Sequence, residues 1–406
     1  MSAADGIPLS RVLVVGAGLA GARTVIELRR QGYTGWVGLI GAESIPPYDR
    51  PPLSKHLLDR PAPAWLADEL ATDALDLADQ VLLGTAATGL ELTADQVRVS
   101  TDAAGELTAD AVVLATGSTP MNPWPTARVL HTADDAAALR ADLAPGRRLA
   151  IIGAGWIGAE IAGVAAAAGV EVTVLEALAG PLPVLGAVGD LTRRWWESAG
   201  VDLRTGVRVS SVDDRGVWLA DGAHVPADLV VAAVGARPAS DWLTGALTRD
   251  PDGSIRVDAQ LQPLNGSPRV RVVGDLARRR SARHGWVSGG HWDAALRGPA
   301  VAVAGLLGAP VPEDPAPYVF STQFGHELAL YGEPGRTDDV LLREADDGWT
   351  ALWFAPGTER LSAVFTVDRP RDVAAARRLF AAEQVPALDR ALVTDPSTPL
   401  RAALRG

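Results

Sequence analysis

The stretch that decides the fold is "RVLVVGAGLAGARTVIEL", from Arg11 to Leu28, and a second version of it, "RRLAIIGAGWIGAEIAGVAAAAG", begins at Arg147. Each has a short β-branched run, then the pattern G-x-G-x-x-G, and then a run with helical spacing. The first glycine allows a tight turn, the second lets a pyrophosphate approach the backbone, and the third lets the helix pack closely on the strand. The N-terminus of the helix then offers free N–H groups to the phosphates. The sequence therefore predicts two dinucleotide sites.

The six glycines of the two patterns are the first candidate site residues. They are Gly16, Gly18 and Gly21 in the first copy, and Gly153, Gly155 and Gly158 in the second. A lone pattern of this kind is weak evidence, but a second expected strand follows each copy, ending at Ile40 and at Glu176. This context predicts an α/β fold with a parallel sheet in each of two Rossmann-like domains.

An acid at the end of the second strand is expected to hold the adenosine ribose hydroxyls. Glu176 has this position in the second copy, and no basic residue follows it before Arg193, which favours NADH over NADPH. In the first copy Ala42 and Glu43 lie at the corresponding place, directly after the end of the expected strand. Glu43 is the candidate there, and the alternative interpretation is an ordinary solvated loop acid.

Composition narrows the functional classes. The chain has 406 residues, enough for two or three domains, and a net charge of −12, which argues against binding to nucleic acid or to an anionic membrane. We find neither a signal-peptide pattern nor an apolar run long enough for a membrane span, so a cytoplasmic protein is expected. The chain has no cysteine, which excludes disulfides, thiolate metal sites and a redox-active cysteine pair, and the histidine spacing predicts no metal site.

Lys55 is the only lysine of the chain, and it lies in "YDRPPLSKHL" (residues 48–57). A lysine differs from an arginine because its charge is compact and leaves more of the neighbouring space open. One interpretation is a functional role that a guanidinium would obstruct. The alternative is a surface lysine that has remained by chance.

Several motifs in a fixed order make the chain resemble one family. These are the first glycine pattern, "YDRPPLSK", "LATG" (residues 114–117), the second glycine pattern and "VVGD" (residues 272–275). Together they resemble the FAD-dependent ferredoxin reductases of bacterial oxygenase and cytochrome P450 systems, the putidaredoxin reductase type, and more distantly apoptosis-inducing factor. The resemblance runs from about Arg11 to about Phe380 and includes "PYVFSTQFG" and "TVDRPRDVAAARRL" near the C-terminus.

The resemblance implies a domain organisation and a reaction. An FAD-binding domain (residues 1–115 and 236–312) would enclose an NADH-binding domain (116–235), and a proline-rich linker (308–317) would lead to a C-terminal α+β interface domain (313–406). NADH would give a hydride to FAD, and single electrons would pass to a small iron–sulfur ferredoxin. A monomer or homodimer is expected. The absent cysteines agree, because a disulfide reductase of similar fold needs a cysteine pair beside the flavin.

The resemblance also assigns site residues. Lys55 would lie near the reactive edge of the flavin and pair with Glu160 of the second glycine helix within about 4 Å, and these two are the predicted catalytic residues. Trp156 would flank the nicotinamide, and Asp275 would bind the ribityl chain. The predicted FAD-binding residues are Gly16, Gly18, Gly21, Glu43, Arg50, Lys55, Thr116, Gly117, His131, Asp275 and Trp292. The predicted NAD-binding residues are Gly153, Gly155, Trp156, Gly158, Glu176 and Gly235.

Departures from the family pattern leave the electron acceptor open. Where the family usually has an acid, an asparagine, a ribose-binding acid and a phosphate-binding arginine, this chain has Gly290, Ala294, Ala42 and His131. The family's "FWSDQ" is "VFSTQ" here. Two alternatives therefore stay beside the ferredoxin reductase: an oxidase or small-molecule oxidoreductase that uses oxygen or an organic acceptor, and an NADH-sensing flavoprotein.

One basic segment is a candidate docking site for an acidic ferredoxin. "LARRRSARHGWVSGGHW" has Arg278, Arg279, Arg280 and Arg283 with no acid, in a chain that is acidic overall. The alternative is that these arginines pair with carboxylates inside the protein. Elsewhere, Trp195 and Trp196 are expected to be core residues, and His291 is the one histidine worth testing.

Overall fold

The computed structural model describes residues 9–311, 315–382 and 384–405. The chain divides into two compact units. Unit 1 comprises Met1–Asp49, Ala64–Thr119 and Arg237–Tyr318, and unit 2 comprises Arg50–Pro63, Pro120–Ala236 and Val319–Gly406. The predicted NADH-binding and C-terminal segments thus belong to the same unit, together with the short segment that carries Lys55. Part of the predicted linker, residues 312–314, lies outside the described residues.

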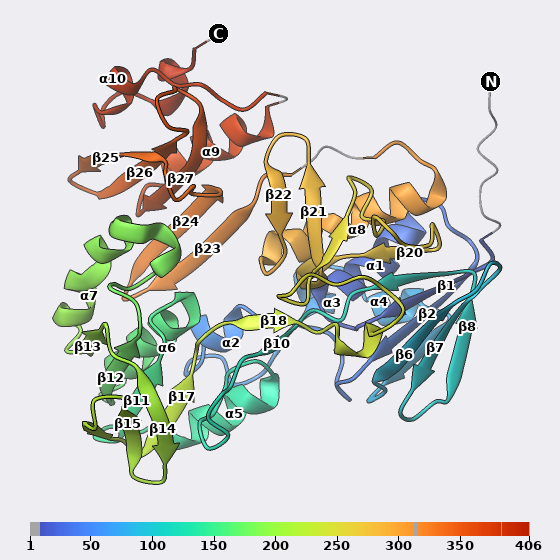
Figure 1. Cartoon of the computed structure of the whole chain (residues 1–406), viewed down its shortest axis with the longest axis horizontal. Coiled ribbons are helices and arrows are strands. Elements are labelled where there is room, and N and C mark those ends of the chain that lie inside the picture. The colour runs from blue at the N-terminus through green and yellow to red at the C-terminus, as the bar shows by residue number, and fades with distance from the viewer. Residues whose placement is uncertain (1–8, 312–314, 383, 406) are drawn as a thin grey trace. The chain divides into compact units, whose positions relative to one another are not determined.

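Unit 1 is built on a parallel five-stranded sheet with the order β20-β9-β1-β2-β5. Figure 1 labels β1, β2 and β20 of this sheet. Its strands are β1 (Arg11–Val15), β2 (Trp36–Gly41), β5 (Gln80–Leu83), β9 (Ala111–Leu114) and β20 (Val270–Val272). The registers Val15↔Ile40 and Val15↔Leu114 bring the carboxyl ends of three neighbouring strands to one edge. Ligands of such sheets bind beyond the carboxyl ends of the strands, so the first glycine loop lies at the expected edge.

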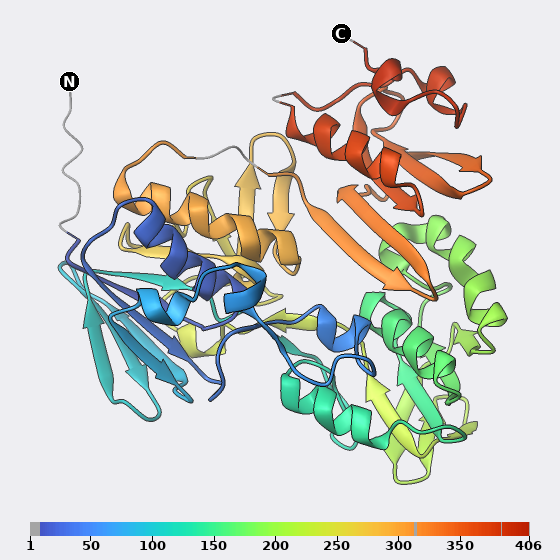
Figure 2. The ribbon, with the colours of Figure 1, turned by 180° about the vertical axis from the view of Figure 1, so that it is seen from behind.

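Two helices of unit 1 pack against each other, α1 (Leu19–Arg30) and α8 (Trp292–Leu307). Figure 2 shows them side by side. The central strands read as continuous apolar runs because both faces of a parallel sheet are covered, and Val12, Val14, Val112 and Leu114 are fully buried.

Smaller elements complete unit 1. The antiparallel sheet β6 (Ala87–Leu92), β7 (Val97–Thr101) and β8 (Glu106–Ala109) packs beside the main sheet, and β21 (Ala277–Ser281) and β22 (Gly285–Ser288) form a hairpin next to β19 (Ile255–Val257). The remaining elements are β3 (Tyr48–Asp49), β4 (Ala64–Trp65), α3 (Leu66–Glu69), α4 (Ala74–Leu77), η2 (Asp241–Leu243) and η3 (Gly274–Leu276). Strands β10 (Ser118–Pro120) and β18 (Ala236–Pro238) lie where the chain passes from one unit to the other.

Unit 2 contains a second parallel sheet, with the order β13-β12-β11-β17. Its strands are β11 (Arg148–Ile152), β12 (Glu171–Glu176), β13 (Asp202–Thr205) and β17 (Leu229–Ala232), and α6 (Trp156–Ala167) follows β11 directly. The antiparallel strands β14 (Val209–Asp213), β15 (Gly216–Leu219) and β16 (His224–Pro226) lie near it, and the other elements are α2 (Pro52–Lys55), α5 (Ala133–Asp142), η1 (Pro183–Thr192) and α7 (Arg193–Ser198). Trp195 and Trp196 are 6% and 0% exposed, which confirms them as core residues.

The C-terminal part of unit 2 is a five-stranded antiparallel sheet with the order β23-β24-β27-β26-β25. Its strands are β23 (Tyr318–Gln323), β24 (His326–Gly332), β25 (Asp339–Ala345), β26 (Gly348–Phe354) and β27 (Leu361–Val367). Helix α9 (Pro370–Ala381) packs on β24 and β27, and α10 (Arg390–Val393) and η4 (Leu400–Ala403) follow it. Among the described helices, none is both long enough and apolar enough to cross a membrane.

Candidate nucleotide and electron-transfer sites

The first glycine loop has the geometry that its sequence predicts. Gly16 has φ +108°, and a Cβ there would lie 2.3 Å from the carbonyl oxygen of Ala115. A Cβ on Gly21 would lie 1.7 Å from the Gly16 oxygen. A Cβ on Gly18 would meet no atom within 4 Å, and Gly18 is also the N-cap of α1 without a side-chain cap. The loop therefore presents bare backbone and uncapped N–H groups to open space, where a pyrophosphate fits.

The second glycine loop repeats this geometry in unit 2. Gly153 has φ +106°, and its Cβ would lie 2.5 Å from the Ala233 oxygen, while a Cβ on Gly158 would lie 2.1 Å from the Gly153 oxygen. Gly155 again faces open space and is the N-cap of α6. Both loops thus fit a dinucleotide for the same backbone reasons.

The acids after the two loops have different surroundings. Glu176 is 7% exposed, and its carboxylate accepts hydrogen bonds of 2.8 Å from the backbone N–H of Ala154 and of 2.8 Å from that of Leu178. It therefore ties the end of β12 to the glycine loop while free lone pairs remain for a ribose. Glu43 is half-buried and accepts a 2.6 Å hydrogen bond from the Tyr48 hydroxyl. Glu43 is thus bonded to a residue near it in sequence, and its role toward a ribose stays a prediction.

The predicted ion pair between Lys55 and Glu160 is present. Lys55 Nζ lies 2.6 Å from Glu160 Oε1, and the side chains are 13% and 3% exposed. Ser54 Oγ donates to Glu160 Oε2 at 2.5 Å, and the Ser321 hydroxyl also hydrogen-bonds to Glu160 Oε1. The ring of Phe320 has its centroid 5.0 Å from Lys55 Nζ. Helices α2 and α6 and strand β23 therefore meet at one buried carboxylate in unit 2.

Two predicted FAD-binding residues in unit 1 are held by side chains that the motifs did not single out. Trp292 Nε1 donates to Asp49 Oδ1 at 2.7 Å, which orients the indole at the start of α8. Asp275 accepts from the Ser118 hydroxyl at 2.7 Å and from the backbone N–H of Gly290 at 3.1 Å. The glycine that replaces the family acid thus supplies a backbone donor to Asp275.

Thr116 and Gly117 are tied by hydrogen bonds to one neighbouring residue of unit 1. Thr116 Oγ1 donates to the Ala239 oxygen at 2.9 Å, and the Ala239 N–H donates to the Gly117 oxygen at 2.9 Å. These bonds fix the end of the unit 1 sheet where the chain leaves it.

In unit 2, Gly235 has φ +99° and accepts from the Met121 N–H, while Arg50 donates to the backbone oxygen of His131. The Trp156 ring packs on Phe365 with the centroids 6.2 Å apart. Roles of these residues toward a cofactor stay predictions.

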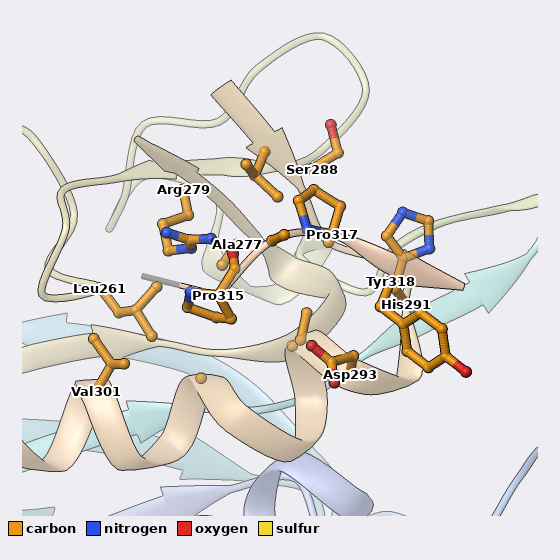
Figure 3. Close-up of a pocket in the computed structure, with 16 residues that line it drawn as sticks. Leu261, Ala277, Arg279, Ser288, His291, Asp293, Val301, Pro315, Pro317 and Tyr318 are labelled. Atoms are coloured by element: carbon orange, nitrogen blue, oxygen red, sulfur yellow. Dashed lines mark hydrogen bonds between the residues drawn. The ribbon is translucent and has the colours of Figure 1, made fainter. Parts of the chain in front are cut away.

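A small cavity in unit 1 lies beside His291. Figure 3 shows His291, Asp293 and Tyr318 toward one end of it and Leu261 and Val301 toward the other. Its volume of about 40 Å³ suits a water molecule and is far too small for a flavin ring. Burial lowers the pKa of His291 below its ordinary value, although the carboxylates of Asp275 and Asp293 oppose this, so the imidazole is neutral at pH 7.

Two arginines of the basic segment make an ion pair or a hydrogen bond within unit 1. Arg278 pairs with Asp250 at 3.2 Å, and Arg279 donates to the backbone oxygen of Pro315 at 2.9 Å. Arg280 is exposed, and Arg283 is half-buried. Burial, with smaller contributions from Arg283 and Arg279, lowers the pKa of His284 to about 4, so His284 adds no charge to the segment at neutral pH. The alternative of internal pairing therefore holds for Arg278.

Sequence reasoning missed the hydroxyls on Glu160 and the carboxylate on Trp292. Ser54 and Asp49 both lie within "YDRPPLSK", and Ser321 lies within "VFSTQ", so the segments were identified but these side chains were not. The burial of these hydroxyls, which makes a partner necessary, is visible in the structure and not in the local sequence, because Ser54 is followed by Lys55 and Ser321 by Thr322.

Comparisons with known proteins agree with this geometry. Residues 10–297 match the family model "Pyridine nucleotide-disulphide oxidoreductase", and residues 318–404 match "Reductase C-terminal". The ferredoxin–NAD(+) reductase component of the p-cumate 2,3-dioxygenase system of Pseudomonas putida is 30% identical over 98% of this chain and 99% of its own. Among solved structures, Fdr9 is similar with a TM-score of 0.87 and 38% identity, over 97% of this chain and 99% of that one. The reductase in the covalent putidaredoxin reductase–putidaredoxin complex has a TM-score of 0.86 and 29% identity, again over 97% and 99%.

Proposed function

Because the chain belongs to the pyridine nucleotide-disulphide oxidoreductase family, we propose that it is a flavoprotein that takes electrons from NADH and delivers them to a small iron–sulfur ferredoxin. The observation that carries the proposal is a pair of equivalent glycine loops in a chain without cysteine. Two dinucleotide sites suit one cofactor that stays bound and one that binds and leaves in each turnover. Because the chain has no cysteine, it cannot use the redox-active cysteine pair of the disulfide reductases for which the family is named. A ferredoxin acceptor agrees with what the relatives are named for.

FAD fits the first loop because the Gly18 side of it is open and the flanking glycines admit no side chain. Gly16, Gly18 and Gly21 would hold the pyrophosphate, with Glu43 near the ribose. Asp275 and Trp292 are both held in fixed orientations by neighbours in unit 1, as binding residues should be. We extend the proposal to the domain organisation, with residues 1–115 and 236–312 for FAD, 116–235 for NADH, and 313–406 as the interface domain.

NADH fits the second loop for the same reasons, and Glu176 supports NADH over NADPH. Its carboxylate is buried and fixed by two backbone N–H groups, so it would repel a 2′-phosphate. The first basic residue after it in sequence is Arg193, and Arg193 pairs with Asp190. We therefore expect a clear preference for NADH.

FAD, when bound, supplies the chemistry that accepts a hydride and releases electrons singly. The protein orients the groups beside the flavin and excludes water from them. The Lys55 ammonium is fixed by Glu160 and by the face of Phe320, so it presents one compact donor in a defined direction. An arginine at this position would occupy more of the space that a nicotinamide requires. We propose that this is the reason why the one lysine of the chain is at this position.

We extend the proposal to the docking of ferredoxin on the basic segment (residues 276–292). Arg280 is the exposed arginine of the basic segment, and an acidic partner would be attracted to it against the net charge of the protein. Arg278, which is already paired, would contribute little. Arg279 and Arg283 would support the patch mainly through their charge.

One comparison tests the proposed function against its alternatives. Anaerobic mixing with NADH should first reduce the bound flavin. NADH consumption is then measured in air without another acceptor, with cytochrome c, and with cytochrome c plus an acidic [2Fe–2S] ferredoxin. A reductase is fast only when the ferredoxin is present, an oxidase is fast in air alone, and a sensor is slow in all three. Fast turnover in air alone would overturn the assignment.

A further inference from the structure

Strand β23 of the C-terminal sheet reaches the carboxylate of Glu160. Ser321 and Gln323 are each 1% exposed, and because alternate residues of a strand share a face, both point the same way. Gln323 Nε2 donates to Ser321 Oγ at 3.0 Å, and Ser321 hydrogen-bonds to Glu160 Oε1. The strand therefore brings a hydroxyl to Glu160 on α6, together with an amide that is bonded to this hydroxyl.

The direction of this hydrogen-bond chain is set by its donors. A serine hydroxyl has one hydrogen, and the amide N–H of Gln323 occupies its oxygen as an acceptor site, so the hydroxyl hydrogen is directed to Glu160. Lys55 donates to the same oxygen, Oε1, and Ser54 donates to Oε2. Three donors on one carboxyl group match a carboxylate, which only accepts.

Burial makes this arrangement difficult to replace by water. Glu160 is 3% exposed, so a donor that is removed leaves a gap beside a charged group. Lys55 has a flexible stem, and its head is located by Glu160 on one side and by the Phe320 ring on the other. A change in the orientation of the Glu160 carboxylate therefore moves the ammonium as well.

We propose that Ser321, oriented by Gln323, is a positioning residue for the Lys55–Glu160 pair, so that the C-terminal sheet takes part in the NADH half of the reaction. This inference rests on the proposed function. Strand β23 would then support flavin reduction by NADH, in addition to any contact with a protein acceptor. Loss of the Ser321 hydroxyl keeps both Lys55 and Glu160 but lets the carboxylate rotate, and the ammonium moves with it.

The test is anaerobic stopped-flow reduction of the bound flavin by NADH, with the limiting rate and the apparent Kd for NADH measured separately. We expect Ser321→Ala to lower the limiting rate about tenfold, the scale of a small misplacement of reacting groups. The apparent Kd for NADH and the FAD content should change less than about twofold, because the hydrogen bonds of the Ser321 hydroxyl are to Glu160 and Gln323, outside the two glycine patterns. Ser321→Thr retains a hydroxyl and should recover most of the rate.

Two further variants separate positioning from general loosening of the sheet. Thr366→Val removes another buried hydroxyl of the same C-terminal sheet, one that donates to the Ala329 oxygen at 3.4 Å, and it should leave the limiting rate unchanged. Gln323→Met releases the Ser321 hydroxyl without deleting it and should slow reduction about threefold, a part of the same misplacement effect. If Ser321→Ala does not hold FAD, the Gln323→Met result decides.

The outcomes distinguish this inference from the proposed function. If NADH fails to reduce the flavin of the unmodified protein, the proposed function is wrong. If the unmodified protein is reduced and Ser321→Ala is equally fast, or if Thr366→Val slows reduction as much as Ser321→Ala does, the positioning role is wrong.

Discussion

Helices α1 and α6 follow equivalent glycine loops, and each carries a buried glutamate, but the partners of the two glutamates differ. Glu27 on α1 is 1% exposed and is bound by Arg23, Arg30 and Gln31, all within one turn of its own helix. Glu160 on α6 is 3% exposed, and among the residues that the structure describes its carboxylate is hydrogen-bonded by side chains of α2 and β23. A charge that is satisfied within its helix can be explained by the fold alone.

A charge that depends on distant segments is a different case. Ser54 and Lys55 are more than a hundred residues from Glu160 in sequence, as is Ser321. Ordering three segments around one carboxylate is costly in conformational entropy, and apolar residues of similar size would stabilise the core at least as well. We therefore assign a structural role to Glu27, and the contrast supports the proposed functional role of Glu160.

The largest expected effect is on protein stability, and it follows from the different surroundings of two glycines in the first loop. Gly21→Ala places a Cβ 1.7 Å from a backbone oxygen and should destabilise unit 1 by about 3 kcal/mol, with loss of FAD-loaded protein. Gly18→Ala, whose Cβ meets no atom within 4 Å, should keep the thermal stability and weaken FAD binding. Thermal unfolding and flavin content measure both. Equal melting temperatures for the two variants would contradict the assigned roles of the glycines.

The next largest effect is on the rate of flavin reduction, and it distinguishes Glu160 from Glu27. Lys55→Met should slow flavin reduction by NADH about 10–100-fold, because a donor that orients the reacting groups is lost. FAD content should change little. Arg23→Met is the matched control, since it removes one cation from a buried glutamate that keeps Arg30 and Gln31. It should lower stability but leave the reduction rate unchanged, and a similar slowing in both variants would remove the distinction.

A smaller effect on nucleotide binding distinguishes Glu176 from Glu43, the acids that follow the two glycine loops. Glu176→Ala removes a fixed, buried carboxylate and should weaken NADH binding by about 1.5 kcal/mol, the value of a charged hydrogen bond. Glu43→Ala should not affect NADH, although it should weaken FAD slightly. Titration of the oxidised enzyme with NAD⁺ and flavin release assays provide the measurements. Equal use of NADPH by the unmodified protein would show that Glu176 has been misassigned.

The smallest expected effect concerns the basic segment. Replacing Arg278, Arg279 and Arg280 by glutamine together should raise the apparent KM for ferredoxin about two- to threefold at low salt, since surface charges mainly affect the rate of association. The effect should disappear as salt is added. Arg280→Gln alone should reproduce most of it, because Arg278 is paired with Asp250. Unchanged ferredoxin kinetics in the triple variant would move the docking site elsewhere.

Local backbone requirements explain which parts of the molecule could be predicted. The glycine patterns predicted both loops correctly because the constraint acts within six residues, and the strand ends at Ile40 and Glu176 agree with β2 and β12 to within one residue. The Lys55–Glu160 pair was predicted only through family resemblance. The Ser321 and Asp49 contacts were missed because each joins segments far apart in sequence, and no local pattern reports such contacts. Internal pairing was one of the two interpretations of the basic segment, but Asp250 could not be predicted as the partner of Arg278 for the same reason.

The solitary lysine has a consequence for chemical modification. Amine-acylating reagents have one side-chain target in this chain, and that target is 13% exposed and held by a carboxylate. The rate of acylation therefore measures how often the Lys55 head group leaves its partner, without the background of surface lysines that obscures such experiments in most proteins. Carbodiimide coupling, which joins carboxylates to amines, cannot trap a ferredoxin through the guanidinium groups of the basic segment. Apart from a link through Lys55 or a terminal amine, such a cross-link would join an amine of the ferredoxin to a carboxylate of this chain.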